Sequence, residues 1–378
     1  FVEWATLLYM RYHKARGADD LAAIAPFLAP AVLVAPPREG APLRSVDGVV
    51  VGGVGLVAFH ERPDRLELVV RFEANYTTTF ASGEQQSWWT HESWTFARAA
   101  GVRSRLPDDV ERFGCPSCGS PLERTSLARC ASCGNALTPG AHDWYVERMD
   151  VHSREKRGPL LEGDVEEVGT DLPTLYDRQL PAARQSLVAK PGFSWQGFEQ
   201  RARFIFGELQ AGWSAQKWER LRPWETEAVF QQHRFWLEEF RRNQMKNVLD
   251  RIQLRRVDVC KVDDDPHYDV VTARMFASMI DVRVDRAGKV VGGNPRSPRV
   301  FTEYWTFIRR RDSTSPSTFA SPSGSSGSSG SSAARCPSCG APLNISQAGV
   351  CESCGTKITT GKFDWVLSRI EQDEEYAG

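Results

Sequence analysis

The sequence predicts an α+β protein made of two copies of one domain, in which helices come first, strands follow, and a cysteine-rich insertion precedes the last strand. Eight of the nine cysteines form two copies of the pattern C-x2-C-x11-C-x2-C at a constant offset of 221 residues. The motif E-x-W-T-F-x-R precedes each copy. Apolar residues at helical spacing also give way to alternating β-branched residues. A duplication that carried its cysteines along explains these observations.

The composition is that of an ordinary globular protein. The chain has 378 residues, enough for about two or three domains of roughly 150 residues each. It contains 41% hydrophobic and 25% charged residues, so sizeable cores can form. A formal net charge of −1 provides no general attraction to nucleic acid or anionic lipid. Such contacts would need a local patch.

The repeat and the changes in composition set the expected domain boundaries. The first domain is expected to be truncated at its start. A Ser/Gly/Pro-rich tether is expected to let the second cysteine ribbon move. The connector between the domains is expected to hold one helix near 175–188. The expected boundaries are 1–150 for the first domain, 113–138 for its ribbon, 151–192 for the connector, 193–372 for the second domain, 313–334 for the tether and 335–360 for the second ribbon.

The two copies differ in their predicted helices. In the second copy, the apolar spacing from Phe198 to Trp213 predicts a helix, and Ser214 and Thr226 are candidate N-caps. The apolar stripe expected after Thr226 consists of Phe230, Trp236, Leu237, Phe240, Val248 and Ile252. Between 33 and 66 the first copy has a Pro/Gly-rich stretch instead. We therefore expect the first copy to be degenerate, with a thinner helical layer.

Strands are expected from Arg256 onward in the second copy. They are predicted at 257–259, 269–284 and 300–308, with a hairpin turn at 286–288. The period of two places Glu303, Trp305, Phe307 and Arg309 on one face of the last of these strands. We expect the aromatic side chains of this face to pack on the helices and the charged ones to pair with neighbouring strands. A carboxylate that anchors a ligand is the alternative role for Glu303.

The two cysteine sets predict two tetrathiolate metal sites. Each C-x-x-C-G turn presents two thiolates from one tight loop, and its glycine eases the backbone. Zinc is the expected metal, with iron of the rubredoxin type as the alternative. Since neither set leaves a coordination position open, both sites are expected to be structural. The expected ligands are Cys115, Cys118, Cys130, Cys133, Cys336, Cys339, Cys351 and Cys354.

Metal thiolates favour a reducing compartment, so we expect the cytoplasm or the cytoplasmic face of a membrane. Cys260 stands outside both sets and is expected to be a small buried residue in a strand. The sequence begins with Phe1 and shows neither a signal peptide nor a transmembrane segment. We expect its start to be truncated, and an anchor could precede it.

The order of elements, the E-x-W-T-F-x-R strand and a later D-W-x-L-x-x-I segment resemble the Tim44-like domain family. This is the C-terminal domain of a mitochondrial inner-membrane import-motor scaffold, and its bacterial members similarly insert a C-P-x-C-G ribbon before the last strand. In the second copy the resemblance covers 198–370, through Trp213, Arg222, Pro223, 301–307 and 363–367. In the first copy it is weaker and rests on Pro26, Glu92, Trp94, Phe96 and Trp144.

The resemblance implies a cone similar to the nuclear-transport-factor-two-like (NTF2-like) fold, a curved antiparallel sheet wrapped on helices around an apolar pocket. It also implies a non-enzymatic, membrane-proximal scaffold that binds a protein partner or membrane lipid. The candidate pocket residues are Glu92, Trp94, Phe96, Glu303, Trp305 and Phe307.

Two alternative functions stay open. A carrier of a small apolar ligand, or an enzyme, would use the cone pocket. Against an enzyme, no histidine of one copy recurs at the aligned position of the other, and the acidic run before His267 is typical of a solvated loop. The sequence also shows no catalytic triad, phosphate loop or dinucleotide fingerprint. We therefore expect no enzymatic activity.

Nucleic-acid binding through the ribbons is the second alternative. The second ribbon offers only Lys357 and Lys362 as basic residues, with Glu352 against them. We therefore expect the ribbons to contact protein or simply to staple their domains.

Overall fold

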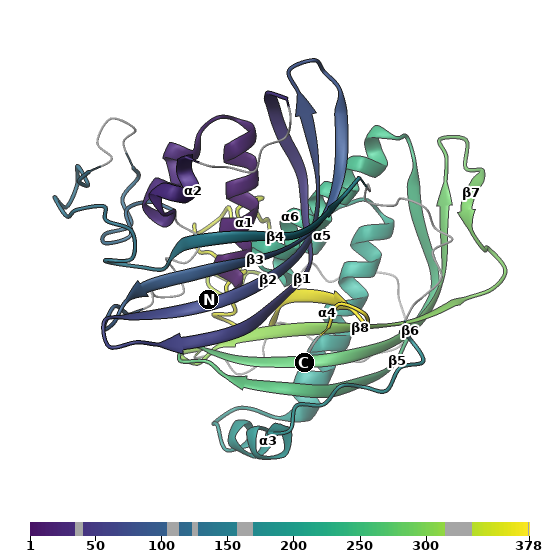
Figure 1. Cartoon of the computed structure of the whole chain (residues 1–378). Helices are drawn as coiled ribbons and strands as arrows, with labels where there is room; N and C mark the ends of the chain where they lie inside the picture. Colours follow the sequence, from purple (N-terminus) through teal and green to yellow (C-terminus); the bar gives the residue numbers. More distant parts are fainter. Residues whose placement is uncertain (35–40, 104–112, 123–127, 157–168, 314–334, 377) are drawn as a thin grey trace. The chain divides into compact units, whose positions relative to one another are not determined.

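The computed structural model divides into two compact units, Phe1–Leu160 and Leu161–Gly378 (Figure 1). Each combines helices with one antiparallel sheet, so the predicted α+β class is confirmed. The structure describes residues 1–34, 41–103, 113–122, 128–156, 169–313, 335–376 and 378. Apart from Ser313, the predicted tether at 313–334 lies outside these ranges. Within them, every helix is too short or too polar to cross a bilayer.

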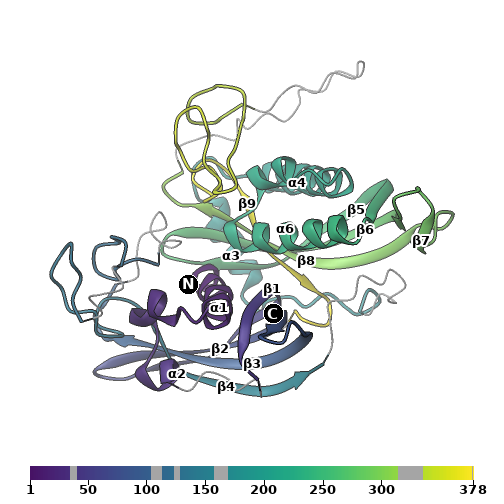
Figure 2. The same ribbon diagram turned by 90° about the horizontal axis from the view of Figure 1, so that it is seen from above.

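Unit 1 packs helix α1 on one face of a four-stranded antiparallel sheet (Figure 2). Its elements are α1 (Val2–Gly17), η1 (Leu21–Phe27), α2 (Pro30–Val34), β1 (Leu43–Glu61), β2 (Arg65–Phe80), β3 (Gln85–Ala99) and β4 (Tyr145–Glu155), with strand order β1-β2-β3-β4. The helix buries aromatic side chains against the sheet. The ring of Tyr9 lies 4.6 Å from that of Phe72 and 4.9 Å from that of Trp94.

The glycine-rich stretch of unit 1 forms strand β1, which its sequence pattern does not predict. Its pairing with β2 shifts register around Gly48 and Gly52, where bulges interrupt the regular alternation. The side chains of this stretch therefore lack the regular period of two that predicts a strand. Gly17, at the end of α1, lies so close to Val46 that a Cβ atom there would collide with the backbone of β1. Small residues thus allow the helix to approach this strand closely.

Unit 2 contains the longest described helix and the larger sheet. Its elements are α3 (Leu180–Val188), α4 (Trp195–Ser214), α5 (Trp218–Leu221), η3 (Arg222–Trp224), α6 (Glu227–Arg242), β5 (Lys246–Asp264), β6 (Tyr268–Val284), β7 (Val290–Gly293), β8 (Arg299–Arg310) and β9 (Val366–Gln372). The strand order is β5-β6-β8-β9, and β7 pairs with β6. Apolar residues of α3, α4 and α6 form one core with the inner face of this sheet.

The boundary between α6 and β5 lies earlier than predicted. Helix α6 ends at Arg242, Gln244 has a positive φ of 53°, and β5 starts at Lys246. Val248 and Ile252, expected on the helix, therefore lie in the strand. These two apolar residues continue the helical spacing by chance, because β5 carries a bulge near Arg251. There φ is 49° and the pairing with β6 shifts.

The predicted caps differ in outcome. Thr226 is the N-cap residue of α6. Ser214 is instead the last residue of α4, and its Oγ accepts a hydrogen bond from the backbone of Leu249 at 3.0 Å. The N-cap of α4 is Ser194, whose Oγ accepts from Gly197 N at 3.0 Å.

The described residues of the expected connector, 151–156 and 169–192, are part of the folded units. The first of them, 151–155, continue strand β4. Leu180 and Leu187 of α3 join the core of unit 2. In the segment before α3, Leu172 O accepts a 2.6 Å hydrogen bond from the fully buried guanidinium of Arg274. This segment therefore covers the outer face of the sheet of unit 2.

The second ribbon is fixed to its unit rather than free to swing. Arg222 is fully buried, and its Nε donates to Gln347 O of the ribbon at 2.8 Å. The same guanidinium donates to Glu225 O at 2.9 Å and to Glu227 Oε2 at 2.7 Å. A single arginine therefore ties the ribbon to the start of α6.

Candidate metal centres and signature strands

The eight predicted ligands form two groups of four thiols, as expected. Each group brings its four sulfur atoms within 4.8 Å of one another. All four C-x-x-C-G turns share one backbone geometry, in which the glycine N–H donates to the carbonyl of the first cysteine at 2.8 to 2.9 Å. The glycines have φ between 72° and 76°, a conformation that L side chains rarely adopt. They are Gly119, Gly134, Gly340 and Gly355.

The sulfur separations fit a tetrahedral metal site. Cys115 and Cys133 have their Sγ atoms 3.9 Å apart, and Cys118 and Cys130 are 3.8 Å apart. In the second group, Cys336 Sγ and Cys354 Sγ are 3.9 Å apart. Thiolates about 2.3 Å from a central zinc ion would lie about 3.8 Å from one another. These distances are too long for disulfides, which need about 2.05 Å.

In each group, hydrogen bonds lower the pKa of one exposed thiol, that of Cys118 in the first group and that of Cys354 in the second. Burial raises the pKa of Cys115 to about 12, whereas hydrogen bonds from Ser120 lower the pKa of Cys118 to about 6. The second group repeats this contrast, with the pKa of Cys336 raised by burial to about 12 and that of Cys354 lowered by Thr356 to about 6. A bound cation would stabilise the remaining thiolates.

Equivalent contacts hold the two turns of each ribbon together. Asn135 Nδ2 donates to Ser117 Oγ at 2.6 Å in the first ribbon. In the second, the hydroxyl oxygens of Ser338 and Thr356, which occupy the same repeat positions, lie 3.1 Å apart. Beneath the sulfurs, each ribbon buries only a few apolar side chains. A metal ion would therefore be the main organising element of each ribbon.

Strands β3 and β8 carry the E-x-W-T-F-x-R motif and are called the signature strands. Each contains the same hydrogen bond between two of its own side chains. Trp94 Nε1 donates to Glu92 Oε2 at 2.8 Å, and Trp305 Nε1 donates to Glu303 Oε2 at 2.9 Å. Residues two apart lie on the same face of a strand, so the spacing E-x-W makes this bond local. The motif therefore supplies its own partner for a carboxylate that faces the helices.

The rest of the motif packs on the D-W segment after each ribbon. The guanidinium of Arg98 lies 4.4 Å from the ring of Trp144, and that of Arg309 lies 5.0 Å from the ring of Trp365. Arg309 also pairs at 3.0 Å with Asp269 on the neighbouring strand β6, as predicted.

The phenylalanines of the motif complete this packing. The ring of Phe96 lies 5.3 Å from that of Phe1, and the ring of Phe307 lies 5.6 Å from that of Phe198. Phe1 and Phe198 in turn contact the D-W tryptophans, at 5.2 and 5.1 Å. The two units thus repeat one arrangement of aromatic side chains.

Each ribbon begins and ends at neighbouring backbone positions. Ala99 N donates to Gly140 O at 2.9 Å where the first ribbon rejoins the sheet. Arg310 N donates to Gly361 O at the same distance in unit 2. Both glycines have positive φ, 80° and 73°. The insertion therefore leaves and re-enters each sheet at almost one point.

The two signature carboxylates differ in their surroundings. Glu92 is buried, and it accepts a 3.2 Å hydrogen bond from the hydroxyl of Tyr9, which closes it off from solvent. His13 Nε2 lies 3.9 Å from the same carboxylate. Burial raises the pKa of Tyr9 and lowers the pKa of His13, so both are neutral side chains of a polar core.

In unit 2 the position of Tyr9 is taken by Phe206, and Glu303 is only half-buried. It accepts a 3.2 Å hydrogen bond from Gln372 on β9, and burial raises its pKa. This amide takes the place of the charged partner expected for Glu303 on a neighbouring strand.

A histidine–carboxylate pair that the repeat could not reveal lies in the same interior. His233 Nδ1 is 2.5 Å from Glu225 Oε2, and Glu225 is fully buried. Burial lowers the pKa of His233, but the charge and hydrogen bond of Glu225 outweigh it and raise the pKa above its ordinary value. Neither residue recurs in unit 1, so comparison of the two copies gave no signal for them.

The six candidate pocket residues lie in packed interiors. Trp94, Phe96, Trp305 and Phe307 are at most 1% exposed and contact other aromatic rings. Glu92 and Glu303 are held by the tryptophans of their own strands. These residues therefore act as core residues in this structure, and their use as a ligand pocket stays a prediction.

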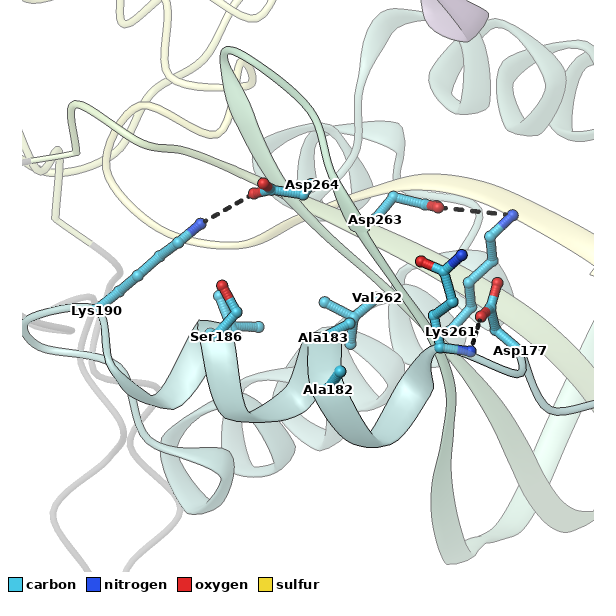
Figure 3. Close-up of a pocket in the computed structure, with 11 residues that line it drawn as sticks. Asp177, Ala182, Ala183, Ser186, Lys190, Lys261, Val262, Asp263 and Asp264 are labelled. Carbon is cyan, nitrogen blue, oxygen red and sulfur yellow. Dashed lines mark hydrogen bonds and ion pairs between the residues drawn. The ribbon is translucent and has the colours of Figure 1, made fainter.

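A groove of about 510 Å³ lies elsewhere, between α3 and the end of β5 (Figure 3). Its lining includes Ala182, Ala183 and Ser186 of the helix and Lys261, Val262, Asp263 and Asp264 of the strand. Lys190 Nζ lies 3.6 Å from Asp264 Oδ1, and Lys261 Nζ lies 3.7 Å from Asp263 Oδ1. The sequence predicts a solvated loop for this acidic run, but its first two residues, Asp263 and Asp264, end strand β5.

Cys260 is a fully buried residue of β5, as predicted. Its Sγ donates to Thr272 O at 3.3 Å, and burial raises its pKa to about 12. This thiol is therefore protonated and unreactive.

Comparison with protein families identifies one match. The model of the Tim44-like domain matches residues 181–318, which extend from α3 past the signature strand β8. The second ribbon and β9 follow the matched segment. A search among curated proteins finds no match.

Proposed function

Residues 181–318 form a Tim44-like domain, and from this premise we propose that the chain is a non-enzymatic scaffold associated with a membrane. In this proposal unit 2 binds a protein partner or lipid, and two structural zinc ions hold the ribbons. The family match carries the proposal. The sheet of unit 2 with its covering helices supports a cone similar to the NTF2-like fold.

We further infer that unit 1 is a second, diverged copy of the same domain. The matching Glu–Trp hydrogen bonds, arginine–tryptophan contacts and ribbon turns support this inference. The carboxylate of Glu92 in unit 1 is closed off from solvent, whereas that of Glu303 in unit 2 is only half-buried. This difference supports a structural role for unit 1 and a binding role for unit 2.

The closed thiol groups support zinc in a structural role. All four ligands of each site come from the chain, so no position remains for substrate or water. Purified chain is expected to contain about two zinc ions by elemental analysis. Chelation should make eight thiols reactive while Cys260 stays protected. Iron in the purified protein, or free thiols before chelation, would contradict the zinc assignment.

The interior supports a scaffold better than an enzyme or an apolar-ligand carrier. The aromatic residues of both signature strands fill the space that a ligand would need. Both signature carboxylates are held by their own strands. Nucleic-acid binding finds little support, because the second ribbon has few basic residues among those described. One of them, Arg335, donates to Gly340 O within the ribbon.

Vesicle flotation tests the membrane association. The chain is mixed with vesicles of phosphatidylcholine, with or without phosphatidylglycerol, and is expected to float with at least one of them. A chain in which Arg274→Ala has loosened unit 2 tests whether the folded unit is needed. Recovery of all folded chain at the bottom of the gradient with both vesicle types would refute membrane association.

A further inference from the structure

Strand β7 and its flanking turns form an arm at one end of the sheet of unit 2 (Figures 1 and 2). The pairing of β6 with β8 ends at Met279, but β6 continues to Val284. Strand β7 pairs with this continuation, from Val282 to Val284. Residues 281–300 are called the β7 arm.

The β7 arm is basic in a chain that is nearly neutral. It contains five basic residues and two acidic ones, a local charge of +3, whereas the formal net charge of the whole chain is −1. A local patch of this kind is what contact with an anionic surface requires. The basic residues are Arg283, Arg286, Lys289, Arg296 and Arg299.

The two acidic residues of the arm are engaged in holding its own structure. Asp285 Oδ1 accepts hydrogen bonds from Ala287 N and Lys289 N, both at 2.9 Å. Asp281 Oδ2 lies 3.4 Å from Arg299 Nη1. These carboxylates therefore stabilise the turn and one arginine, and leave the other basic side chains of the arm without a counter-charge from within it.

Four basic side chains at this end of the sheet remain exposed. Arg286, Lys289 and Arg296 lie in the two turns of the arm and form no ion pair with any described residue. Lys246 of β5 lies opposite Val284 of β6, and it is likewise exposed and without an ion pair among the described residues. Their charges are therefore available to an external anion.

Exposed apolar side chains accompany these charges. Val290 and Val291 of β7 are 39% and 48% exposed, and Val300 of β8 is 49% exposed. Val290 lies opposite Val284, in the same row of the sheet as Lys246. Apolar side chains beside lysine and arginine are typical of surfaces that lie in the interface of an anionic bilayer.

Both turns of the arm are held by hydrogen bonds. Asp285 N donates to Lys289 O at 2.9 Å in the first turn. In the second, Asn294 Oδ1 accepts from Arg296 N at 2.9 Å. A surface that is already formed loses little conformational entropy when it binds. The basic and apolar side chains are thus presented together before any contact is made.

We propose that the β7 arm binds the surface of a membrane that contains anionic lipids. Arg286, Lys289, Arg296 and Lys246 contact lipid phosphates, and the valines of β7 enter the interface beneath the headgroups. A bilayer supplies both negative charge and an apolar layer, whereas a soluble polyanion such as nucleic acid would leave the valines in water. The inference rests on the proposed membrane association and names the element responsible for it.

Flotation of the full, zinc-loaded chain provides the first measurement. The chain is expected to float with vesicles of phosphatidylcholine and phosphatidylglycerol, and not with vesicles of phosphatidylcholine alone. Each basic side chain near an anionic bilayer strengthens binding about fivefold. Salt should weaken the binding, because it screens these exposed charges.

Charge reversal separates the arm from the rest of unit 2. The double variant Arg286→Glu/Lys289→Glu is expected to bind the anionic vesicles at least about tenfold more weakly. The control Arg178→Glu/Arg255→Glu changes the net charge equally at two exposed arginines outside the arm, which also form no ion pair among the described residues. It should bind as the natural chain does. Thermal unfolding confirms that both variants are folded.

Hydrogen exchange locates the contact and tests the apolar part. Exchange followed by mass spectrometry should slow at 284–298 when anionic vesicles are added, and should stay unchanged at 253–259. The variant Val290→Ser/Val291→Ser keeps every charge and is expected to bind at least about fivefold more weakly, since less apolar surface enters the interface. Binding equal to that of the natural chain would contradict insertion of the valines.

The possible outcomes distinguish this inference from the proposed function. Equal flotation of the natural chain and Arg286→Glu/Lys289→Glu would overturn the arm as the binding site and leave membrane association standing. Slower exchange at 284–298 with heparin but not with vesicles would identify a soluble polyanion as the occupant, which also overturns the proposal. Recovery of the natural chain at the bottom of the gradient with both vesicle types would remove the membrane association and this inference with it.

Discussion

At the scale of single residues, the E-x-W spacing explains how two sheets hold a carboxylate inside. The indole N–H of Trp94 or Trp305 donates to the glutamate two residues earlier. The sequence predicted that these residues share a face, but not that they bond to each other. Same-face placement follows from the strand period, whereas the bond depends on side-chain rotamers that the surrounding packing selects.

Loss of this bond should destabilise unit 2. We expect Trp305→Phe to lower the free energy of unfolding by about 1–3 kcal/mol, because Glu303 loses a donor in a partly buried site. Urea unfolding measures the change. In a Glu303→Gln background the same substitution should cost less, since no charge is left without its partner. Equal costs in both backgrounds would show that the loss comes from packing alone.

His233 and His13 should give opposite pH dependence. The folded-state pKa of His233 is raised above the unfolded value of about 6.5, so its contribution is present below that pH and is lost as pH rises through the folded pKa. The folded-state pKa of His13 is lowered, so its contribution is present above about pH 6.5 and is lost on acidification.

Unfolding of single-site variants at several pH values checks these signs. The stability difference between the natural chain and His233→Gln should shrink from pH 6 to pH 9. The difference between the natural chain and His13→Gln should shrink in the other direction, from pH 7 to pH 5. A difference that does not change with pH would contradict the assigned charge state of that histidine.

At the scale of secondary structure, the cysteine turns were the most predictable elements. Four copies of C-x-x-C-G have one backbone geometry because the thiols and the glycine fix it locally. Strands β6 and β8 were also found, since they alternate regularly. The glycine-rich β1 and the start of β5 were missed because bulges disturb the period of two. The docking of the ribbon through Arg222 depends on tertiary contacts that no local pattern contains.

Removal of Arg222 should release the second ribbon. We expect Arg222→Ala to cost at least about 2 kcal/mol, because buried carbonyls and Glu227 lose a charged donor. Arg220→Ala removes a neighbouring arginine whose ion pair with Glu208 is exposed, and should cost less than about 1 kcal/mol. Urea unfolding gives both values. Limited proteolysis within 335–360 should accelerate only for Arg222→Ala, and equal cleavage of both variants would contradict the anchoring role.

At the scale of the whole molecule, the repeat predicted the general order of elements but not their packing. Each unit has its own sheet and its own core, and the ribbon of each unit joins its last two strands. The covering of the sheet of unit 2 by residues 169–176 could not be predicted, because Arg274 reaches them across about a hundred residues of sequence. Polar loops give no signal for such distant partners.

Each unit should fold when produced alone. Fragments 1–156 and 169–378 are expected to unfold cooperatively and to bind about one zinc ion each, since each contains a complete sheet and four thiols. Circular dichroism and elemental analysis check this. A fragment ending at 103 lacks β4 and the ribbon and serves as the control that should not fold. Failure of either complete fragment would show that the units depend on each other.

The close spacing of the two ends of each ribbon has a consequence for how this protein can evolve. Ala99 N donates to Gly140 O in unit 1, and Arg310 N donates to Gly361 O in unit 2. In each unit, one backbone hydrogen bond therefore joins the residues just before and just after the insertion. Whatever lies between these residues can lengthen, shorten or be exchanged without shifting the strands on either side. The ribbon is thus an interchangeable module, and a relative that replaced it with a short turn could keep its sheet intact.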